Sequence, residues 1–352
     1  MSSRKLKVFL IFILVIVSAA LTSVVLFVTP VDQEDKTTSN FSITTGQSTD
    51  EILNDLLEDN LIKNTLAAKL YIRISNNSDF KSGVFTLSKS LSMPEIIQKL
   101  NTQSMTEEVT VTFNEGIRVI DYASIAKKNL GIDEEEFKKA CNDTTFINEL
   151  KSKYQLIKDY KFNDKEIYQL EGLLAPNTYN FSVGSDAKTV IDRLVSQSNT
   201  VYLEEKAKID KSQFNTNEIY TLASIVESEA KTYEDRQLVA SIFANRLDKK
   251  ITLGSDVTTY YGLQLNMSDR DLTEAELTQV NGYNTRADML GLPIGPINSP
   301  SLEAIDAVLT YKANDYLYFV SDKNGKIYAT KTLSEHENKI QELKDQGLWF
   351  TY

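Results

Sequence analysis

The pattern of apolar and polar residues divides the chain into three stretches of different character. Val8–Val28 is an apolar run of 21 residues without a charge, whereas Thr29–Thr49 is rich in serine, threonine, aspartate and glutamine. From Asp50 onward, short apolar periodicities alternate with polar turns, as in a globular fold that mixes helices and strands. We therefore predict an α+β fold that follows a separate N-terminal segment.

The apolar run has the length and the flanks of a single transmembrane helix. A helix of about 20 apolar residues spans the hydrocarbon core of a bilayer, and basic residues precede the run. Basic flanks stay in the cytoplasm, so we predict a cytoplasmic tail at residues 1–7, a signal anchor at 8–28 and an extracytoplasmic remainder. A cleaved signal peptide ending near Ser18–Ala20 is the alternative, but the apolar run continues past these small residues. The polar residues 29–49 are predicted to form a flexible stalk.

The remaining chain shows helical and strand periodicities in turn. We predict helices at Asp50–Ile62, Ser92–Leu100, Val119–Leu130, Asn217–Ala230 and Asp235–Leu247, and strands at Gly83–Leu87, Glu108–Phe113, Tyr316–Ser321 and Lys326–Ala329. The stretch Asn281–Pro300 is rich in glycine, proline and asparagine and is long for a simple connector. Long ordered loops often carry function, so we expect this one to contribute to a site.

Composition excludes several kinds of chemistry. The chain has 38 basic and 49 acidic residues, a net charge of −11, which makes it a poor partner for nucleic acid. Cys141 is the only cysteine and His336 the only histidine. These counts argue against an internal disulfide, a Cys–His or Ser–His–Asp site and a zinc site. Neither composition nor motif indicates a metal or an organic cofactor.

Within the predicted helix Asn217–Ala230, Glu227 stands at the edge of the apolar stripe. Small alanines lie one turn from it, while Glu229 lies about 200° around the helix and faces elsewhere. Apolar neighbours disfavour the charged form of a carboxyl group, which suits a general acid. The alternative is a surface glutamate paired with Lys231, and the helix pattern alone favours that interpretation.

Several separated segments share an order and spacing that is more specific than any one of them. They are Leu170–Gly172, Pro176–Tyr179, Leu222–Glu229, Val239–Leu247, Leu253–Gly262, Tyr283–Thr285, Gly291–Ile297 and Tyr316–Val320. Together they resemble the YceG-like family of endolytic murein transglycosylases. The chain departs from the family pattern at Gly254 and Val257, where Gln and Pro are usual, and at Ile327, where His is common.

The resemblance implies an organisation and an activity. It implies a LysM-like subdomain in the region 50–105, a connecting α/β region at 106–169, a mixed α+β catalytic domain at 170–340 and a C-terminal tail at 341–352. It implies a lyase in the cell membrane that cuts the β-1,4 bond between N-acetylmuramic acid and N-acetylglucosamine inside peptidoglycan strands. The products carry 1,6-anhydro ends, and the cut would terminate nascent strands. Peptidoglycan strands are the expected partner, and peptidoglycan synthases of the elongation or division machinery are candidate partners.

The same resemblance places the family's catalytic glutamate on Glu227. The residues that it suggests for substrate binding or support are Asn245, Ser255, Asp256, Tyr261, Tyr283, Asn284 and Thr285.

Each supporting residue also has a structural interpretation. Asp256 is the candidate second acid, with a turn or N-cap role as the alternative. Asn284 and Tyr283 would hydrogen-bond either sugar groups or their own loop. Tyr261 would stack on a sugar ring or pack in the core, and Asn245 would support the site from the neighbouring helix.

One carboxyl group suffices for the expected reaction. It protonates the glycosidic oxygen, and the C6 hydroxyl of the same sugar, held at a high effective concentration, attacks the anomeric carbon. Two alternatives stay open. One is a lysozyme-like hydrolase that uses Glu227 with Asp256, and the other is a non-catalytic peptidoglycan-binding scaffold of the cell-wall machinery.

Overall fold

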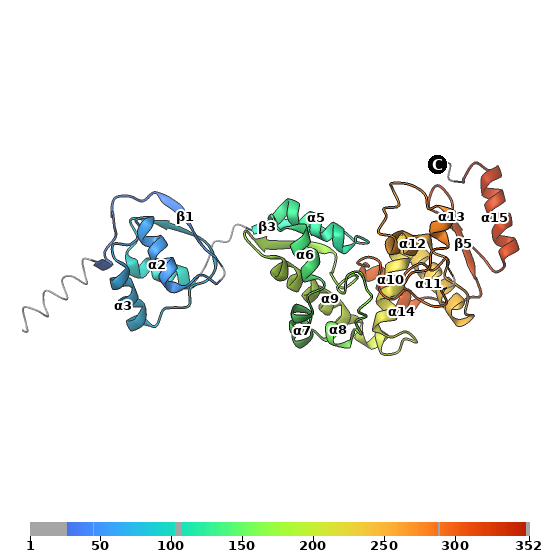
Figure 1. Cartoon of the computed structure of the whole chain (residues 1–352), viewed down its shortest axis with the longest axis horizontal. Helices are drawn as coiled ribbons and strands as arrows, with labels where there is room; N and C mark the ends of the chain where they lie inside the picture. The colour runs from blue at the N-terminus through green and yellow to red at the C-terminus, as the bar shows by residue number, and fades with distance from the viewer. Residues whose placement is uncertain (1–26, 45, 103–107, 288, 350–352) are drawn as a thin grey trace, which may run out of the picture. The chain divides into compact units, whose positions relative to one another are not determined.

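The computed structural model describes residues 27–44, 46–102, 108–287 and 289–349 (Figure 1). The chain divides into two compact units, residues 1–109 with 182–184 and residues 110–181 with 185–352. The predicted anchor lies outside the described residues except for Phe27 and Val28. Among the described helices, none is long and apolar enough to cross a membrane.

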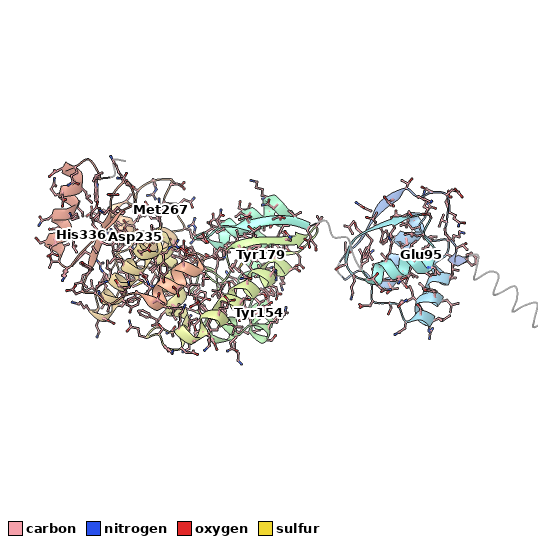
Figure 2. All side chains as sticks on the ribbon, turned by 180° about the vertical axis from the view of Figure 1, so that it is seen from behind. Glu95, Tyr154, Tyr179, Asp235, Met267 and His336 are labelled. Atoms are coloured by element: carbon pink, nitrogen blue, oxygen red, sulfur yellow. The ribbon has the colours of Figure 1, made fainter. Side chains whose placement is uncertain are left out.

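The N-terminal unit packs three helices against a two-stranded sheet. Its elements are β1 (Thr38–Ile43), α2 (Thr49–Glu58), α3 (Thr65–Ser75), β2 (Gly83–Ser88) and α4 (Met93–Thr102). The strands pair antiparallel, from Thr38 opposite Ser88 to Ile43 opposite Gly83. Glu95, labelled in Figure 2, accepts hydrogen bonds from the backbone and hydroxyl of Ser92 and so fixes the start of α4.

The strand β1 corrects the predicted stalk at residues 29–49. Phe41 and Ile43 are buried and alternate with exposed Asn40 and Ser42. Only two apolar residues carry this alternation, so the polar composition of the segment hid it. The strand forms because β2 supplies its hydrogen-bonding partner and α2 and α4 supply apolar side chains to the same core.

The first half of the C-terminal unit surrounds a second small sheet. Its elements are β3 (Glu108–Phe113), α5 (Val119–Leu130), α6 (Glu134–Ala140), α7 (Thr144–Lys153), α8 (Gln155–Asp159), β4 (Asn177–Ser182) and α9 (Ala187–Ile209). The strands β3 and β4 pair, and the hydroxyls of Thr112 and Thr178 meet across them at 2.8 Å. Tyr179 on β4 (Figure 2) packs beside Phe113, whose ring stacks on Tyr122 at 4.7 Å. This aromatic cluster anchors the sheet to α5.

The second half of the unit is mostly helical. Its elements are α10 (Thr216–Glu229), α11 (Tyr233–Asp248), α12 (Asp256–Gly262), α13 (Glu274–Leu277), α14 (Leu302–Thr310), β5 (Tyr318–Ser321), β6 (Ile327–Thr330) and α15 (Leu333–Asp345). Helices α10, α11 and α14 pack against one another (Figure 1). A capping box between Asn215 and Glu218 starts α10, and the residues from Ile219 to Val226 are all buried. The helix therefore forms the centre of this half.

The predicted α+β class is confirmed. Most predicted elements recur within a few residues, and the expected hairpin near the C-terminus is the antiparallel pair β5–β6. The boundaries set at 169/170 and at 340/341 do not separate compact units. The first lies inside the C-terminal unit, and the second falls within α15.

Candidate active site

Glu227 occupies the last turn of α10, where a buried helix reaches the surface of the unit. Ile225 and Val226 before it are fully buried, and the Glu227 side chain is only 7% exposed. Its carboxyl group therefore sits at the edge of the core.

Two other helices supply hydrogen-bond donors to this carboxyl group. The Nη2 of Arg236, near the start of α11, donates to Oε1 at 2.6 Å. The backbone N–H of Ser301 donates to Oε2 at 2.9 Å, and the Ser301 hydroxyl donates to the same oxygen. Ser301 is the N-cap of α14, so the positive end of that helix also faces Glu227. The carboxyl group therefore has one cationic partner and two further hydrogen-bond donors.

These contacts correct the expected environment of Glu227. Lys231, the partner in the alternative interpretation, is exposed, and the partner in the structure is Arg236. The predicted apolar setting holds for the helix face beside Glu227 but not for its carboxyl oxygens. The reason is tertiary: the chain leaves α10 at Ala230, and α11 folds back so that Arg236 also donates to the Ala230 carbonyl at 3.3 Å.

A turn after β3 approaches Glu227 closely. Gly116 adopts a φ of +70°, and a Cβ added there would lie 3.4 Å from Cγ of Glu227. Its N–H donates to the Ser299 carbonyl at 2.8 Å. Glu115, Pro300 and Leu302 adjoin these loop residues in sequence and line a pocket of about 190 Å³. Two loops and a helix end thus form the immediate surroundings of the carboxyl group.

Arg236 connects Glu227 with a second carboxylate. Its Nη1 donates to Oε2 of Glu303 at 2.8 Å, on the first turn of α14. The Glu303 side chain is 64% exposed, in contrast to the enclosed Glu227. One guanidinium group therefore holds one enclosed and one solvent-accessible carboxylate.

The segment around Ser255 packs against Glu229 rather than Glu227. The Ser255 hydroxyl donates to Oε1 of Glu229 at 2.6 Å, and burial raises the pKa of Glu229. This agrees with the prediction that Glu229 faces away from Glu227. Asp256 begins α12 and forms an ion pair with Arg286 at the surface. Among the described contacts, none joins Asp256 to Glu227.

The loop that contains Asn284 is organised by hydrogen bonds within the protein. Asn284 is fully buried, and its Nδ2 donates to the carbonyls of Glu276, Leu277 and Gln279. Its Oδ1 accepts from the Thr259 hydroxyl at 2.7 Å and from the Arg286 N–H at 3.0 Å. Both the oxygen and the nitrogen of the Asn284 amide therefore have partners within the protein.

The other suggested residues also serve this scaffold. The Thr285 hydroxyl forms a hydrogen bond with the Thr258 hydroxyl and accepts one from the Ser255 N–H. Tyr283 and Tyr261 are buried, with ring centroids 4.7 Å apart. Asn245 donates to the carbonyls of Asn314 and Tyr316, at 3.0 and 2.9 Å, and so ties α11 to the chain before β5. These residues support the unit and do not gather around Glu227.

A comparison with known families finds a match over most of the chain. The model of the YceG-like family matches residues 41–342. The chain belongs to this family. The resemblance predicted from the separated sequence segments is thereby confirmed.

Two curated relatives carry a functional name. The endolytic murein transglycosylase of Bacillus subtilis (strain 168) is 32% identical over 315 residues, which cover 89% of this chain and 86% of the relative. The endolytic murein transglycosylase of Streptococcus pneumoniae serotype 2 (strain D39) is 30% identical over 329 residues, 89% of this chain. The match spans only 60% of the length of that streptococcal relative.

A solved structure shares the fold. The crystal structure of a yceG-like protein from Listeria monocytogenes has a TM-score of 0.61 and 26% sequence identity to this chain. The match covers 86% of this chain and 99% of that one.

Sequence reasoning missed the residues that contact Glu227. Ser301 was detectable in part, because a serine after a proline that opens an apolar helical run is a typical N-cap. Gly116 follows the predicted strand Glu108–Phe113, and a glycine at this position indicates only a turn. Arg236 and Glu303 carried no local signal, since their roles depend on how α11 and α14 pack beside α10.

Glu171, in the segment Leu170–Gly172, is a further buried acid of this unit. It accepts hydrogen bonds from the Val119 N–H and the Tyr261 hydroxyl, both at 3.0 Å. Burial raises the pKa of Glu171 to about 8, although these two donors oppose the rise. The residue thus links α5 and α12 through a carboxyl group that is costly to ionise.

Replacing Glu171 by glutamine is expected to flatten the dependence of stability on pH. Because the pKa in the folded chain lies above its ordinary value of 4.5, neutral Glu171 stabilises the fold. The contribution of neutral Glu171 to stability is fully present below pH 4.5, the ordinary pKa of a glutamate. It is lost as the pH rises from there to about 8, by no more than about 1.4 kcal/mol per pH unit. Urea unfolding at several pH values will measure the slope.

The variant Glu171→Gln should therefore be the more stable chain at about pH 8, the upper end of that range. The same change at exposed Glu234 on α11, Glu234→Gln, is the control and should leave the slope unaltered. A Glu171→Gln chain that loses stability equally at every pH would show that Glu171 acts as an ionised acceptor instead.

Proposed function

We propose that this chain is a membrane-anchored endolytic lytic transglycosylase of peptidoglycan. It cleaves the β-1,4 bond between N-acetylmuramic acid and N-acetylglucosamine within glycan strands and leaves 1,6-anhydro ends. The observation that carries the proposal is the enclosed carboxyl group of Glu227, held by Arg236 and Ser301. Family membership and the names of the curated relatives support it.

The first step requires Glu227 in its protonated form. Its proton passes to the glycosidic oxygen while the bond from that oxygen to the anomeric carbon breaks. The new carboxylate is then stabilised by Arg236 and by the two donors of Ser301. These contacts are strongest when the charge develops, which is the condition for lowering the barrier.

The second step returns the proton. The C6 hydroxyl of the muramic residue forms the new bond to the anomeric carbon and gives its proton to the Glu227 carboxylate. No water is consumed, and the enzyme ends in its starting state. The hydrogen bonds from Arg236 and Ser301 keep the carboxylate in place between the two proton transfers.

Membrane anchoring and the N-terminal unit belong to the same proposal. The apolar run Val8–Val28 would hold the chain in the membrane, with both units on the outer side. The region 50–105 would act as a LysM-like subdomain and contact glycan. Peptidoglycan synthases of the elongation or division machinery are the proposed protein partners, since cleavage would end the strands that they make.

A hydrolytic muramidase is the second candidate, and Glu303 is the observation in its favour. Hydrolysis needs a second carboxylate to activate water. Asp256, the candidate from the sequence, pairs with Arg286, whereas Glu303 shares Arg236 with Glu227. Glu303 is therefore the better-placed second acid for that reaction.

Mass spectrometry of digested glycan strands separates the two reactions. We expect fragments with 1,6-anhydro-muramic ends, and we expect Glu303→Gln to keep this product and most of the rate. Hydrated, reducible ends would contradict the transglycosylase proposal, as would incorporation of ¹⁸O from labelled water into the new ends. If the products are hydrated and Glu303→Gln no longer forms them, the muramidase reaction is assigned to Glu227 and Glu303.

A further inference from the structure

Helix α3 presents an apolar stripe that the fold leaves uncovered. Leu66, Leu70 and Ile74 recur every four residues, which places them on one face of the helix. Their exposed fractions are 73%, 50% and 77%. Among the described residues twelve large apolar side chains are exposed, and five of them lie between Phe27 and Ile74. The exposed apolar surface is therefore concentrated in this part of the chain.

The stripe is not needed to hold α3 in place. The opposite face of the helix carries Ala68 and Ile72, which are buried in the core of the N-terminal unit. Asn64 caps the start of the helix through a bond from the Ala67 N–H at 2.9 Å. One buried face and a capped start thus fix the helix, and the exposed face can contact a partner.

Basic side chains border the stripe. Lys69 and Arg73 lie four residues apart and form a row beside Leu66, Leu70 and Ile74. Arg73 is exposed, and Lys69 is 42% exposed while it pairs with Asp50 at 3.0 Å. An apolar row of leucine and isoleucine beside a row of lysine and arginine is typical of a helix that lies in a lipid interface. The charged ends of the basic side chains then extend toward the anionic lipid headgroups.

The start of α3 lies beside the point where the apolar run ends. Val28, the last residue of that run, packs against the core of the N-terminal unit. The Nζ of Lys63 donates to the Thr29 hydroxyl at 2.9 Å, and Asn64 follows as the cap of α3. Figure 1 shows α3 next to the position where the described chain begins.

We propose that the face of α3 formed by Leu66, Leu70 and Ile74 lies on the surface of the anionic lipid bilayer that anchors the chain. The inference rests on the membrane anchoring in the proposed function. If the chain leaves the bilayer at Val28, the Lys63–Thr29 contact places the start of α3 close to the lipid headgroups. Burial of Leu66, Leu70 and Ile74 in the headgroup region then removes their apolar surface from water. The N-terminal unit is then held against the membrane in one orientation, not suspended above it.

The test uses the full chain in vesicles of phosphatidylcholine and phosphatidylglycerol. An environment-sensitive fluorophore is attached through Leu70→Cys, and in a second chain through Gln98→Cys, an exposed position of α4 in the same unit. The native Cys141 is buried, which favours selective labelling, and the unsubstituted chain measures its background. We expect the label at position 70 to emit at shorter wavelength, to lose quenching by iodide and to be quenched by spin-labelled lipid. The label at position 98 should stay accessible to iodide.

Flotation of the same vesicles separates this inference from the proposed anchor. A chain that floats with the vesicles while position 70 is quenched by iodide as strongly as position 98 overturns the docking of α3 and leaves the anchor standing. A chain that does not float overturns both. Protection of position 70 that grows with the ratio of protein to lipid would indicate contact with a second copy and would also overturn the proposal.

Discussion

Replacing Glu227 by glutamine is expected to reduce the rate of glycan cleavage by about a thousandfold, within the range that general acid–base catalysis contributes. Glutamine has nearly the same shape, and its one carbonyl oxygen can still accept a hydrogen bond from Arg236 or from Ser301, which donate to different oxygens of Glu227. It cannot donate a proton to the leaving oxygen or take one from the C6 hydroxyl. The loss should fall on kcat, because the side chain is retained and its proton is used only in the transition state. Release of soluble fragments from purified glycan strands will measure it.

The matched control is Glu229→Gln, the same substitution two residues later on α10. Glu229 bonds to the Ser255 hydroxyl and takes no part in the Glu227 cluster, so this variant should retain activity within a few-fold. The fluorescence of Trp349, the only tryptophan, will show that the C-terminal unit of both variants is folded. Full complementation of a deletion strain by Glu227→Gln would instead favour the non-catalytic scaffold.

The sequence predicted the features that depend on local periodicity. The predicted helix that carries Glu227 agrees with α10 within one residue at each end, because its apolar residues recur every three to four positions. The strand β3 was predicted with the same bounds that the structure gives. The divergence of Glu227 and Glu229 also followed from helix geometry alone.

Features that depend on distant contacts could not be predicted in this way. The strand β1 has only Phe41 and Ile43 as apolar residues and exists because β2 pairs with it. Asn284 and Tyr283 had the composition of a binding loop, yet their polar groups are used within the protein. Family resemblance identified Glu227, but only packing of α10, α11 and α14 shows what surrounds it.

Replacing Arg236 by methionine is expected to lower the free energy of unfolding of the C-terminal unit by about 3 kcal/mol. The side chains of Arg236 and Glu227 are only 10% and 7% exposed, so the change leaves an enclosed carboxylate without its cationic partner. It also removes the donor to the Ala230 carbonyl at the end of α10. Urea unfolding followed by the fluorescence of Trp349, which belongs to this unit, will report the loss.

The double variant Arg236→Met, Glu227→Gln tests the cause of that loss. Removing the charge of Glu227 removes most of the cost of leaving it unpaired, so the double variant should recover about 1–2 kcal/mol relative to Arg236→Met alone. Arg246 on the same helix is the matched control, since its guanidinium group donates to the carbonyls of Thr252, Leu253 and Leu317. Glu227→Gln should not rescue Arg246→Met. Additive losses in the Arg236 pair would mean that Arg236 stabilises the unit through packing, and that Glu227 holds its position for catalysis without the guanidinium group.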